Sequence, residues 1–235
     1  MQIEPNTFIC ADSIEVLHEM PDKAFDLCLT DPPYGVGLEY RSYQDTVDNL
    51  GCIIGALSDM LRVSKLVVLT PGVKNMFRWP EPDHAGVYYY PSSPCFSNWG
   101  TCLYQPIYYY GKDPHVGKLM PDSFMSYEVS ERVGHPCPKP LKQWISLLLR
   151  TSKPGDLVID PFCGSGTTAL ACHKTGRRFL CIDKDEEYIK IAQQRYADLI
   201  AQQDLFGQNE DGAQNTSEGR GTDVQHPQVE MRLEQ

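Results

Sequence analysis

The chain has 235 residues, a mass of 26.6 kDa and a formal net charge of −10 at pH 7, a length that suits one sizeable domain or one domain with a tail. Apolar residues make up 41%, enough to bury a core, and we expect no membrane span because no run reaches about 18 apolar residues. The pI near 5.0 argues against nucleic-acid binding by the charge of the whole chain, although it leaves room for a local basic groove. Residues 1–5 lack the basic and apolar regions of a secretory signal, so we expect a cytoplasmic protein.

Short apolar runs alternate with helical patterns along most of the chain. The expected strands, in chain order, are Thr7–Cys10, Phe25–Thr30, Lys65–Thr70, Val87–Tyr90, Leu103–Tyr110, Leu157–Asp160 and Arg178–Asp183. The expected helices are Ser13–Met20, Asp48–Val63, Leu141–Thr151, Thr167–Lys174 and Glu186–Ala201. Several strands are continuously apolar and many are followed by a helix, so the pattern predicts an α/β fold with a doubly wound, mostly parallel sheet.

The aromatic-rich stretch 88–110 departs from this alternation. Its two strands have no helix between them, so they are expected to form an antiparallel pair at one edge of the sheet. Packing of the rings within the strands is the preferred interpretation. A base-stacking role remains an alternative for Phe96 or Trp99, which lie in the connecting loop.

The C-terminal segment has a different composition. Residues 203–235 contain seven acidic and two basic residues and few apolar ones, too few to offset the entropy of ordering the chain. We therefore expect a folded domain over residues 1–201 and an acidic, disordered tail over 202–235. The tail carries half of the net charge, which leaves −5 for the domain.

The nine cysteines are odd in number and form no C-x-x-C pair. Buried free thiols of a cytosolic protein are the preferred interpretation. The set Cys95, Cys102, His135 and Cys137 fits no standard zinc spacing, so no metal site is expected.

The segment 157–169 reads as a strand, a glycine-rich turn and a helix. Gly164 and Gly166 allow a sharp turn and a close approach of the backbone to a ligand, and with Ala169 they form G-x-G-x-x-A. Asp183 ends the next strand, where a carboxylate binds both ribose hydroxyls of an adenosine-containing cofactor. The candidate cofactor-binding residues of this turn are Phe162, Gly164, Ser165, Gly166 and Thr167.

Two cofactors fit this turn. A dinucleotide would place its pyrophosphate at the helix N-terminus, whereas S-adenosylmethionine has no phosphate and carries a sulfonium and an ammonium group. Asp160, at the end of the first strand, suits that ammonium group. A P-loop is excluded because no Lys-Ser or Lys-Thr follows the glycines.

The segment 31–34 follows an apolar strand and contains two successive prolines. Pro32 and Pro33 stiffen the loop and have no N–H groups, so Asp31 and the Pro32 carbonyl form a rim of acceptors beside the aromatic ring of Tyr34. Such a rim suits a planar substrate that carries an amine, because the amine donates two hydrogen bonds while the ring stacks on Tyr34. Two acceptors on an exocyclic amine localise its lone pair for in-line attack on a methyl sulfonium, and Asp31 stabilises the positive charge that develops.

These segments together closely resemble the DNA amino-methyltransferases, which make N6-methyladenine or N4-methylcytosine. In that family Asp-Pro-Pro-Tyr is the catalytic motif and Phe-x-Gly-x-Gly binds S-adenosylmethionine, and the fold is a Rossmann-like sheet of seven strands. The catalytic segment here precedes the cofactor turn, the order of the circularly permuted beta class. The resemblance covers roughly residues 6–200 and implies catalytic roles for Asp31, Pro32, Pro33 and Tyr34.

Two further segments carry the resemblance. Residues 135–140 are similar to the His-Pro-Thr-Gln-Lys-Pro element beside the cofactor, which implies cofactor binding by Lys139, although Cys137 and Pro138 replace Thr-Gln. Residues 10–13 are similar to the Gly-Asp-Ser opening, which places Asp12 near the adenine of the cofactor.

The resemblance also indicates the substrate and the partners. Residues 111–134 are where this class often holds target-recognition structure, and this short segment, with Lys112, His115, Lys118 and Arg132, predicts a short recognition sequence or help from a partner subunit. The loop Val36–Asp48 is a candidate lid. We expect duplex DNA whose target base is flipped out of the stack, and the resemblance leaves a homodimer open.

Several functions compete at this stage. Asp31 favours adenine N6 over cytosine N4, because cytosine enzymes more often carry Ser at the first motif position. Asp31 also argues against a protein-glutamine methyltransferase, which usually shows Asn-Pro-Pro-Tyr. A non-catalytic nucleic-acid-binding protein would not need the intact 31–34 segment, and a nicotinamide dehydrogenase would leave that segment unexplained.

Overall fold

The computed structural model describes residues 3–91, 95–97, 100–129, 133–134 and 138–210. The chain divides into two units, Met1–Leu199 and Ile200–Gln235. None of the helices in the described residues combines the length and the apolar composition that a membrane span requires.

The helices and strands follow the predicted alternation. The α-helices are α1 (Ser13–Glu19), α2 (Val47–Gly55), α3 (Leu57–Val63), α4 (Leu141–Thr151), α5 (Thr167–Thr175) and α6 (Glu186–Glu210), with a short 3₁₀ helix at Met76–Arg78. The strands are β1 (Thr7–Cys10), β2 (Phe25–Thr30), β3 (Ser64–Leu69), β4 (His84–Tyr89), β5 (Cys95–Ser97), β6 (Gly100–Cys102), β7 (Tyr104–Tyr110), β8 (Phe124–Met125), β9 (Leu157–Asp160) and β10 (Arg178–Asp183).

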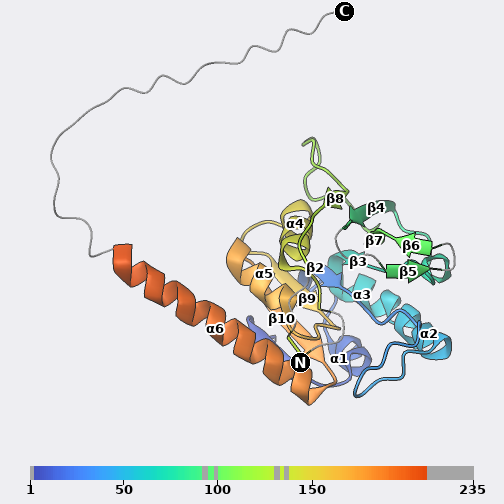
Figure 1. Cartoon of the computed structure of the whole chain (residues 1–235), viewed down its shortest axis with the longest axis horizontal. Coiled ribbons are helices and arrows are strands. Elements are labelled where there is room, and N and C mark those ends of the chain that lie inside the picture. The colour runs from blue at the N-terminus through green and yellow to red at the C-terminus, as the bar shows by residue number, and fades with distance from the viewer. Residues whose placement is uncertain (1–2, 92–94, 98–99, 130–132, 135–137, 211–235) are drawn as a thin grey trace, which may run out of the picture. The chain divides into compact units, whose positions relative to one another are not determined.

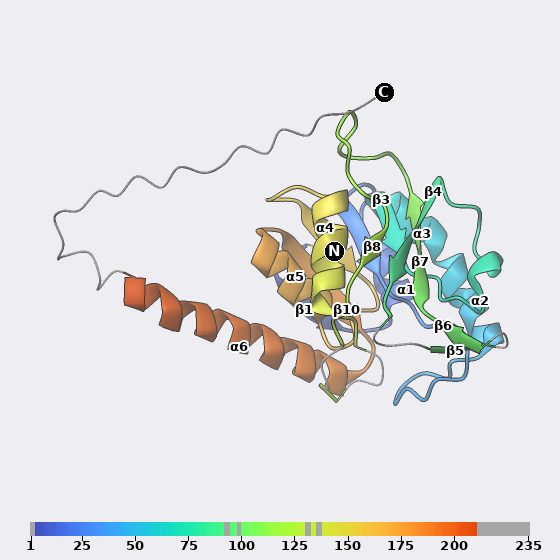
Figure 2. The same ribbon diagram turned by 45° about the horizontal axis from the view of Figure 1, so that its top comes forward.

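The main sheet has eight strands in the order β1-β10-β9-β2-β3-β7-β4-β8 (Figure 1). The five strands from β1 to β3 in this order are parallel, and β7 is antiparallel to both β3 and β4. Figure 2 shows the green strands β4 and β7 at the opposite end of the sheet from β1 and β10. The predicted doubly wound, mostly parallel sheet and the antiparallel β4–β7 pair are therefore confirmed.

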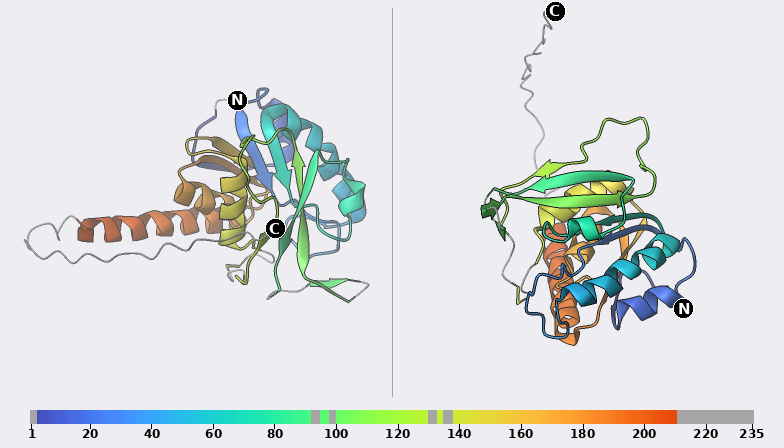
Figure 3. Two further views of the ribbon diagram at one scale, coloured as in Figure 1. Left: turned by 90° about the horizontal axis from the view of Figure 1, so that it is seen from above. Right: turned by 90° about the vertical axis from the view of Figure 1, so that its right-hand side faces the viewer.

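Helices cover both faces of the parallel part of this sheet. Figure 3 shows α1, α2 and α3, in blue and cyan, on one side, and α4 and α5, in yellow and orange, on the other. Each face has its own hydrophobic core, and β2 contributes to both: Cys28 packs with the first set of helices, whereas Leu27 and Leu29 pack with the second. This double burial explains why the strand is apolar at successive positions.

The structure departs from the prediction at one helix and at one additional strand of the main sheet. The helix predicted over Asp48–Val63 is interrupted at Ala56, because Gly55 is a weak helix former and its carbonyl accepts a hydrogen bond from the Ser58 hydroxyl at 3.0 Å. The two residues of β8 extend the sheet beyond the β4–β7 pair, which gives eight strands rather than seven. A strand of two residues is too short to produce a periodic signal in the sequence.

The last helix is longer than predicted. The sequence placed its end at Ala201, whereas α6 continues to Glu210. The prediction rested on how little apolar surface the segment can bury, but a helix satisfies its own backbone groups without burial. Residues 211–235, the rest of the predicted tail, lie outside the described residues.

The aromatic stretch is largely core, as preferred from the sequence. Tyr88, Tyr108, Tyr109 and Tyr110 are at most 8% exposed. Phe96 is in β5, but its side chain lies outside the described part, as does Trp99, so the base-stacking role stays a prediction.

Candidate functional site

The site lies where the direction of the sheet winding reverses. From β2 the chain crosses to β3 on one side, and from β9 it crosses to β10 on the other, so adjacent β2 and β9 form a topological switch point. Ligands bind outside the carboxyl ends of the strands at such points. Asp31 follows β2, and Asp160 ends β9, so two predicted site residues flank the crevice.

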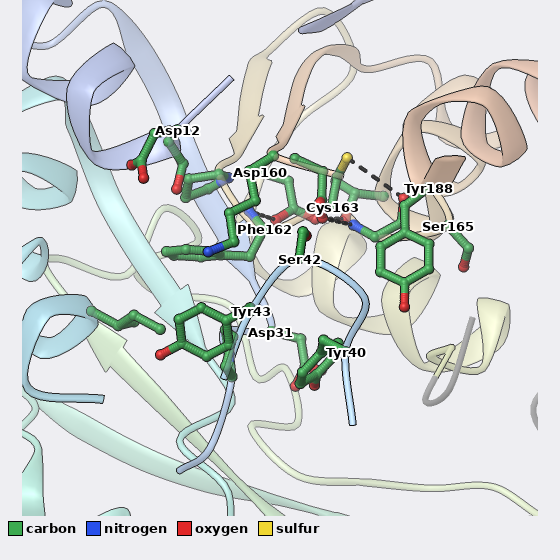
Figure 4. A pocket seen from close by; sticks show the side chains of 18 of the residues that line it. Asp12, Asp31, Tyr40, Ser42, Tyr43, Asp160, Phe162, Cys163, Ser165 and Tyr188 are labelled. Carbon is green, nitrogen blue, oxygen red and sulfur yellow. Dashed lines mark hydrogen bonds between the residues drawn. The ribbon is translucent and has the colours of Figure 1, made fainter. Parts of the chain in front are cut away.

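A pocket of about 330 Å³ occupies this position. Its volume lies at the small end of the range typical of small-molecule sites. Figure 4 shows how the loop that carries Tyr40, Ser42 and Tyr43 curves across the pocket. The predicted site residues that line the pocket are Asp12, Asp31, Pro33, Lys139, Asp160, Phe162, Gly164, Ser165, Thr167 and Asp183.

Asp160 is only 2% exposed and is held by short contacts. Its Oδ1 accepts hydrogen bonds from the Thr30 hydroxyl at 2.7 Å and from the Phe162 N–H at 3.1 Å, and its Oδ2 accepts one from the Thr168 hydroxyl. Trp144 Nε1 donates in turn to Thr168 Oγ1 at 2.6 Å. Burial raises the pKa of Asp160 to about 7 despite these donors, because desolvation disfavours the charged form.

Asp183 is fixed by two backbone amides. Its Oδ2 accepts from the Gly164 N–H at 2.9 Å, and its Oδ1 accepts from the Asp185 N–H at 2.9 Å. A carboxylate has about four lone-pair positions, so each oxygen keeps one for a ligand hydroxyl. Burial also raises the pKa of Asp183. Asp12 caps α1 by accepting from the Ile14 N–H at 2.9 Å and faces the same pocket.

The second glycine of the turn, Gly166, has a packing role in addition to the predicted tight turn. Gly166 adopts a left-handed φ of +78°, and a Cβ atom there would lie 2.6 Å from Cβ of Ala192 on α6. The position therefore needs glycine because the turn packs against a helix, and Gly166 does not line the pocket. Ser165 is held nearby, since its carbonyl accepts from Arg195 at 2.6 Å.

The carboxylate of Asp31 lies in a dense polar cluster. Its Oδ1 accepts from the hydroxyls of Thr70 and Tyr34, and its Oδ2 lies 2.9 Å from Lys139 Nζ. The side chains of Asp31 and Lys139 are 18% and 11% exposed. The phenol of Tyr34 also accepts from Lys139 Nζ at 2.8 Å and from Gln105 Nε2. The hydroxyl of Tyr34, rather than a free ring face, is thus the part that meets Asp31.

The ring of Tyr34 is placed by backbone neighbours. A Cβ atom at Gly72 would lie 2.6 to 2.9 Å from three ring atoms, so the main chain at Gly72 packs directly on the ring. Asn75 Nδ2 donates to the Tyr34 carbonyl at 2.7 Å. Pro32 is buried, and neither Pro32 nor Tyr34 is among the pocket-lining residues.

The loop after the 31–34 segment is held by Asp45, a residue that the sequence analysis did not identify. Asp45 is 3% exposed and accepts from the backbone N–H groups of Gly35 at 2.6 Å and of Val36 and Leu38 at 3.0 Å each. Farther along, Lys184 Nζ lies 4.4 Å from the ring centroid of Tyr43, and both line the pocket. The candidate lid 36–48 therefore forms one wall of the pocket; its movement stays a prediction.

Sequence reasoning also missed Thr70 and Gln105. Thr70 directly follows β3, so its position at a carboxyl strand end was a usable signal. Gln105 is a buried amide within the aromatic strand β7. The signal for it in the sequence was a single polar residue in an aromatic and apolar strand. His135 to Cys137, quoted above for the family resemblance, lie outside the described residues.

The predicted recognition segment 111–134 is only partly described. Arg150 on α4 makes two hydrogen bonds to Asp113, at 2.7 and 2.8 Å, which tie its beginning to the domain. Lys112 and Lys118 are exposed, whereas His115 is partly buried and Arg132 is not described. Among the described residues no group of three or more His, Cys, Asp and Glu side chains could hold a metal ion.

The arrangement combines several carboxylates in one pocket. Asp12, Asp31, Asp160 and Asp183 come from the ends of four parallel strands. Such a pocket attracts a cationic ligand, offers acceptors for hydroxyl and amine groups, and opposes a pyrophosphate. The acid-lined turn thus argues against the dinucleotide alternative.

Comparisons with known proteins agree with this description. The DNA methylase family matches residues 92–194. The protein named "Putative methylase YubD" of Escherichia coli (strain K12) is 31% identical over 208 residues, which span 81% of this chain and 89% of YubD.

Two solved structures share the fold. The complex of M1.HpyAVI with S-adenosylmethionine superposes with a TM-score of 0.60 at 21% identity and covers 80% of this chain and 98% of that one. The PvuII DNA methyltransferase, described as cytosine-N4-specific, has a TM-score of 0.60 at 16% identity and covers 84% and 92%. The similarity to YubD extends over most of both chains, and the fold and the segments at the switch point agree with it. The chain therefore belongs to the N6/N4 DNA methylase family.

Proposed function

We propose that this protein transfers a methyl group from S-adenosylmethionine to the exocyclic N6 amine of an adenine in duplex DNA. The observation that carries the proposal is that Asp31 and Asp160 lie at adjacent strand ends and line the same pocket. We assign Asp160 to the cofactor and Asp31 to the amine.

The carboxylates of the pocket fit the cofactor. S-adenosylmethionine, when bound, supplies an electrophilic methyl group on a positive sulfur. Asp160 suits the ammonium group of its methionine part, and the oxygens of Asp183 each retain a position for a ribose hydroxyl. Asp12 follows β1, whose last residue, Cys10, pairs with Asp183 on β10, and this position suits the adenine end.

The catalytic part of the proposal concerns Asp31. Its carboxylate accepts a hydrogen bond from the amine, which draws the nitrogen towards tetrahedral geometry and makes its lone pair available. It also stabilises the positive charge that develops on nitrogen as the N–C bond forms and the C–S bond breaks. The surplus proton leaves the nitrogen through Asp31 or to water, and the hydroxyls of Thr70 and Tyr34 hold the carboxylate in place.

A base within a duplex cannot reach a crevice at the end of a sheet, so the proposal includes base flipping. Adenine is preferred over cytosine because the motif begins with Asp31 rather than Ser. Cytosine N4 remains the second candidate, since the fold is shared with the PvuII cytosine-N4 enzyme and both bases present an exocyclic amine. A homodimer stays a prediction.

Transfer of labelled methyl groups tests the function. Purified protein is incubated with methyl-labelled S-adenosylmethionine and unmethylated duplex DNA, and the digested DNA is separated into nucleosides. We expect label in N6-methyladenine; label in N4-methylcytosine would favour the second candidate. Asp31→Ala should reduce transfer by at least about a hundredfold while cofactor affinity persists, whereas Asp22→Ala, at an exposed residue, should act like the wild type.

The negative outcomes are distinct. Cofactor binding without any transfer would favour the non-catalytic alternative. Transfer by Asp31→Ala at the wild-type rate would refute the assignment of Asp31. Sequencing of DNA from a methylation-deficient host that expresses the protein would identify the recognition sequence.

A further inference from the structure

The two oxygens of Asp31 are used differently. Oδ1 accepts hydrogen bonds from the hydroxyls of Thr70 and Tyr34, and Gln105 Nε2 lies 3.4 Å away. A carboxylate oxygen has about two lone-pair positions, so fixed protein hydroxyls fill those of Oδ1. An incoming amine must therefore use Oδ2, where the ammonium group of Lys139 lies at 2.9 Å.

The ammonium group of Lys139 already makes contacts that suit an amine. Lys139 Nζ donates to Tyr34 Oη at 2.8 Å and lies 2.9 Å from Asp31 Oδ2. A nitrogen that carries hydrogens therefore occupies the acceptor site in this structure. The sequence analysis assigned Lys139 to cofactor binding; Lys139 lines the pocket, and its ammonium group contacts Asp31 and Tyr34 of the 31–34 segment.

We propose that Lys139 holds the place of the target amine: its ammonium nitrogen occupies the acceptor site at Asp31 Oδ2 until the exocyclic amine of the flipped base displaces it. This inference rests on the proposed function and adds a positioning residue to it. In the absence of DNA, Lys139 keeps the partly buried carboxylate paired and oriented. When the base enters, the ammonium group of Lys139 moves away from Asp31 Oδ2 and the amine takes its place.

The flexibility of the Lys139 side chain supports an exchange at Asp31 Oδ2. The lysine side chain is a flexible four-carbon stem, so its ammonium group can swing aside while its backbone stays in place. The carbonyl of Lys139 accepts from the Thr167 hydroxyl at 3.4 Å, which anchors the residue to the start of α5. The groups on Oδ1 are less able to move, because Thr70 has a short side chain and the ring of Tyr34 packs on Gly72.

A second pair of amides keeps Tyr34 oriented when Lys139 leaves. Gln143 on α4 is 1% exposed, and its Nε2 donates to Gln105 Oε1 at 3.1 Å. This contact turns the NH₂ end of Gln105 towards Tyr34 Oη, to which it donates. The phenol oxygen therefore still accepts a hydrogen bond from the protein after the exchange, and the phenol O–H still donates to Asp31 Oδ1.

Equilibrium binding to DNA tests the exchange without turnover. The probes are a duplex with the recognition sequence and the same duplex whose target base is purine, which lacks the exocyclic amine, each with S-adenosylhomocysteine present. Lys139→Met removes the competing ammonium group, so we expect affinity for the amine-bearing duplex to rise about tenfold and affinity for the purine duplex to change less than twofold. Lys139→Arg keeps the charge and should show no gain, and Lys153→Met, at an exposed site, is the matched control.

Two further measurements make the proposal refutable. Lys139→Met should bind S-adenosylmethionine within twofold of the wild type; a tenfold loss would return Lys139 to the cofactor role. Equal gains on both duplexes, or no gain on either, would overturn the exchange. If the methionine variant does not fold, a crystal structure of the wild-type complex decides: Lys139 Nζ within 3.5 Å of Asp31 Oδ2 beside a bound base would refute the proposal.

These outcomes separate the two proposals. A wild-type protein that binds the cofactor but transfers no methyl group defeats the proposed function. A wild-type protein that methylates DNA while its Lys139 variants show no amine-dependent gain defeats only the role of Lys139.

Discussion

The buried carboxyl group of Asp160 should make the stability of the ligand-free protein depend on pH. Its pKa is about 7 in the folded protein, against an ordinary value of 3.8. The folded state therefore binds this proton more tightly than the unfolded state. The contribution to stability is fully present below about pH 4 and is lost as the pH rises through about 7. Since one pKa unit corresponds to about 1.4 kcal/mol, the total loss is about 4 kcal/mol.

Replacement by Asn removes the titration and keeps the shape. In Asp160→Asn the amide oxygen can still accept from Thr30 and Phe162, but the amide nitrogen cannot accept from Thr168, which has a fixed cost of about 1–2 kcal/mol. Between pH 5 and pH 8 the wild type should lose about 3 kcal/mol that the variant retains. At about 2–4 °C per kcal/mol for a domain of this size, the Tm of the variant relative to the wild type should rise by about 6–12 °C across that range.

Thermal and urea unfolding of both proteins at several pH values between 5 and 8, without cofactor, measures this difference. All other titrating groups are present in both proteins, so their contributions largely cancel. A difference in free energy of unfolding that stays constant within about 0.5 kcal/mol from pH 5 to pH 8 would refute the reasoning from burial. The variant should also bind S-adenosylmethionine more weakly at pH 8, because a neutral amide has replaced the charged partner of its ammonium group.

Two structural predictions concern the turn and the loop. Gly166→Ala should lower the free energy of unfolding by about 2–4 kcal/mol, because it combines strain at positive φ with a clash against Ala192. The control Gly155→Ala is also at positive φ but has open space around it, so it should cost only about 1–2 kcal/mol in urea unfolding. Equal costs for the two variants would show that the protein relieves the clash with Ala192 by a local shift. Asp45→Asn should lower the free energy of unfolding by about 2–4 kcal/mol, because the amide nitrogen cannot accept hydrogen bonds from the loop N–H groups. Hydrogen exchange at the amides of Val36 and Leu38 should accelerate in this variant. Unchanged exchange at these amides would mean that other contacts hold the loop.

The sequence predicted the parts of the site that depend on local order along the chain. Asp31, Asp160 and Asp183 each come at the carboxyl end of an apolar strand, and parallel strands bring such ends together, so their convergence followed from the fold class alone. The glycine-rich turn was recognised for a similar reason, since its residues are consecutive.

Contacts between distant segments were beyond this reasoning. The sequence does not indicate that Lys139 points at Asp31, 108 residues away in numbering, because the path of its side chain depends on how the segment before α4 packs against the start of α5. The same applies to Gln105, whose amide is oriented by Gln143 on another element. Gly166 was predicted correctly as a tight-turn residue, but the atom that requires glycine there belongs to α6.

The junction between β2 and β9 has a consequence for how the protein is made. Only two residue pairs, Leu27 with Val158 and Cys28 with Ile159, define the register between these strands. Above them, the hydrogen bond between Thr30 and Asp160 links residues that are 130 positions apart in the chain. During synthesis the segment that contains Asp31 emerges long before its partner strand exists. The pocket therefore forms only after most of the chain has left the ribosome, and such a long-range pairing is expected to be a late and slow step of folding.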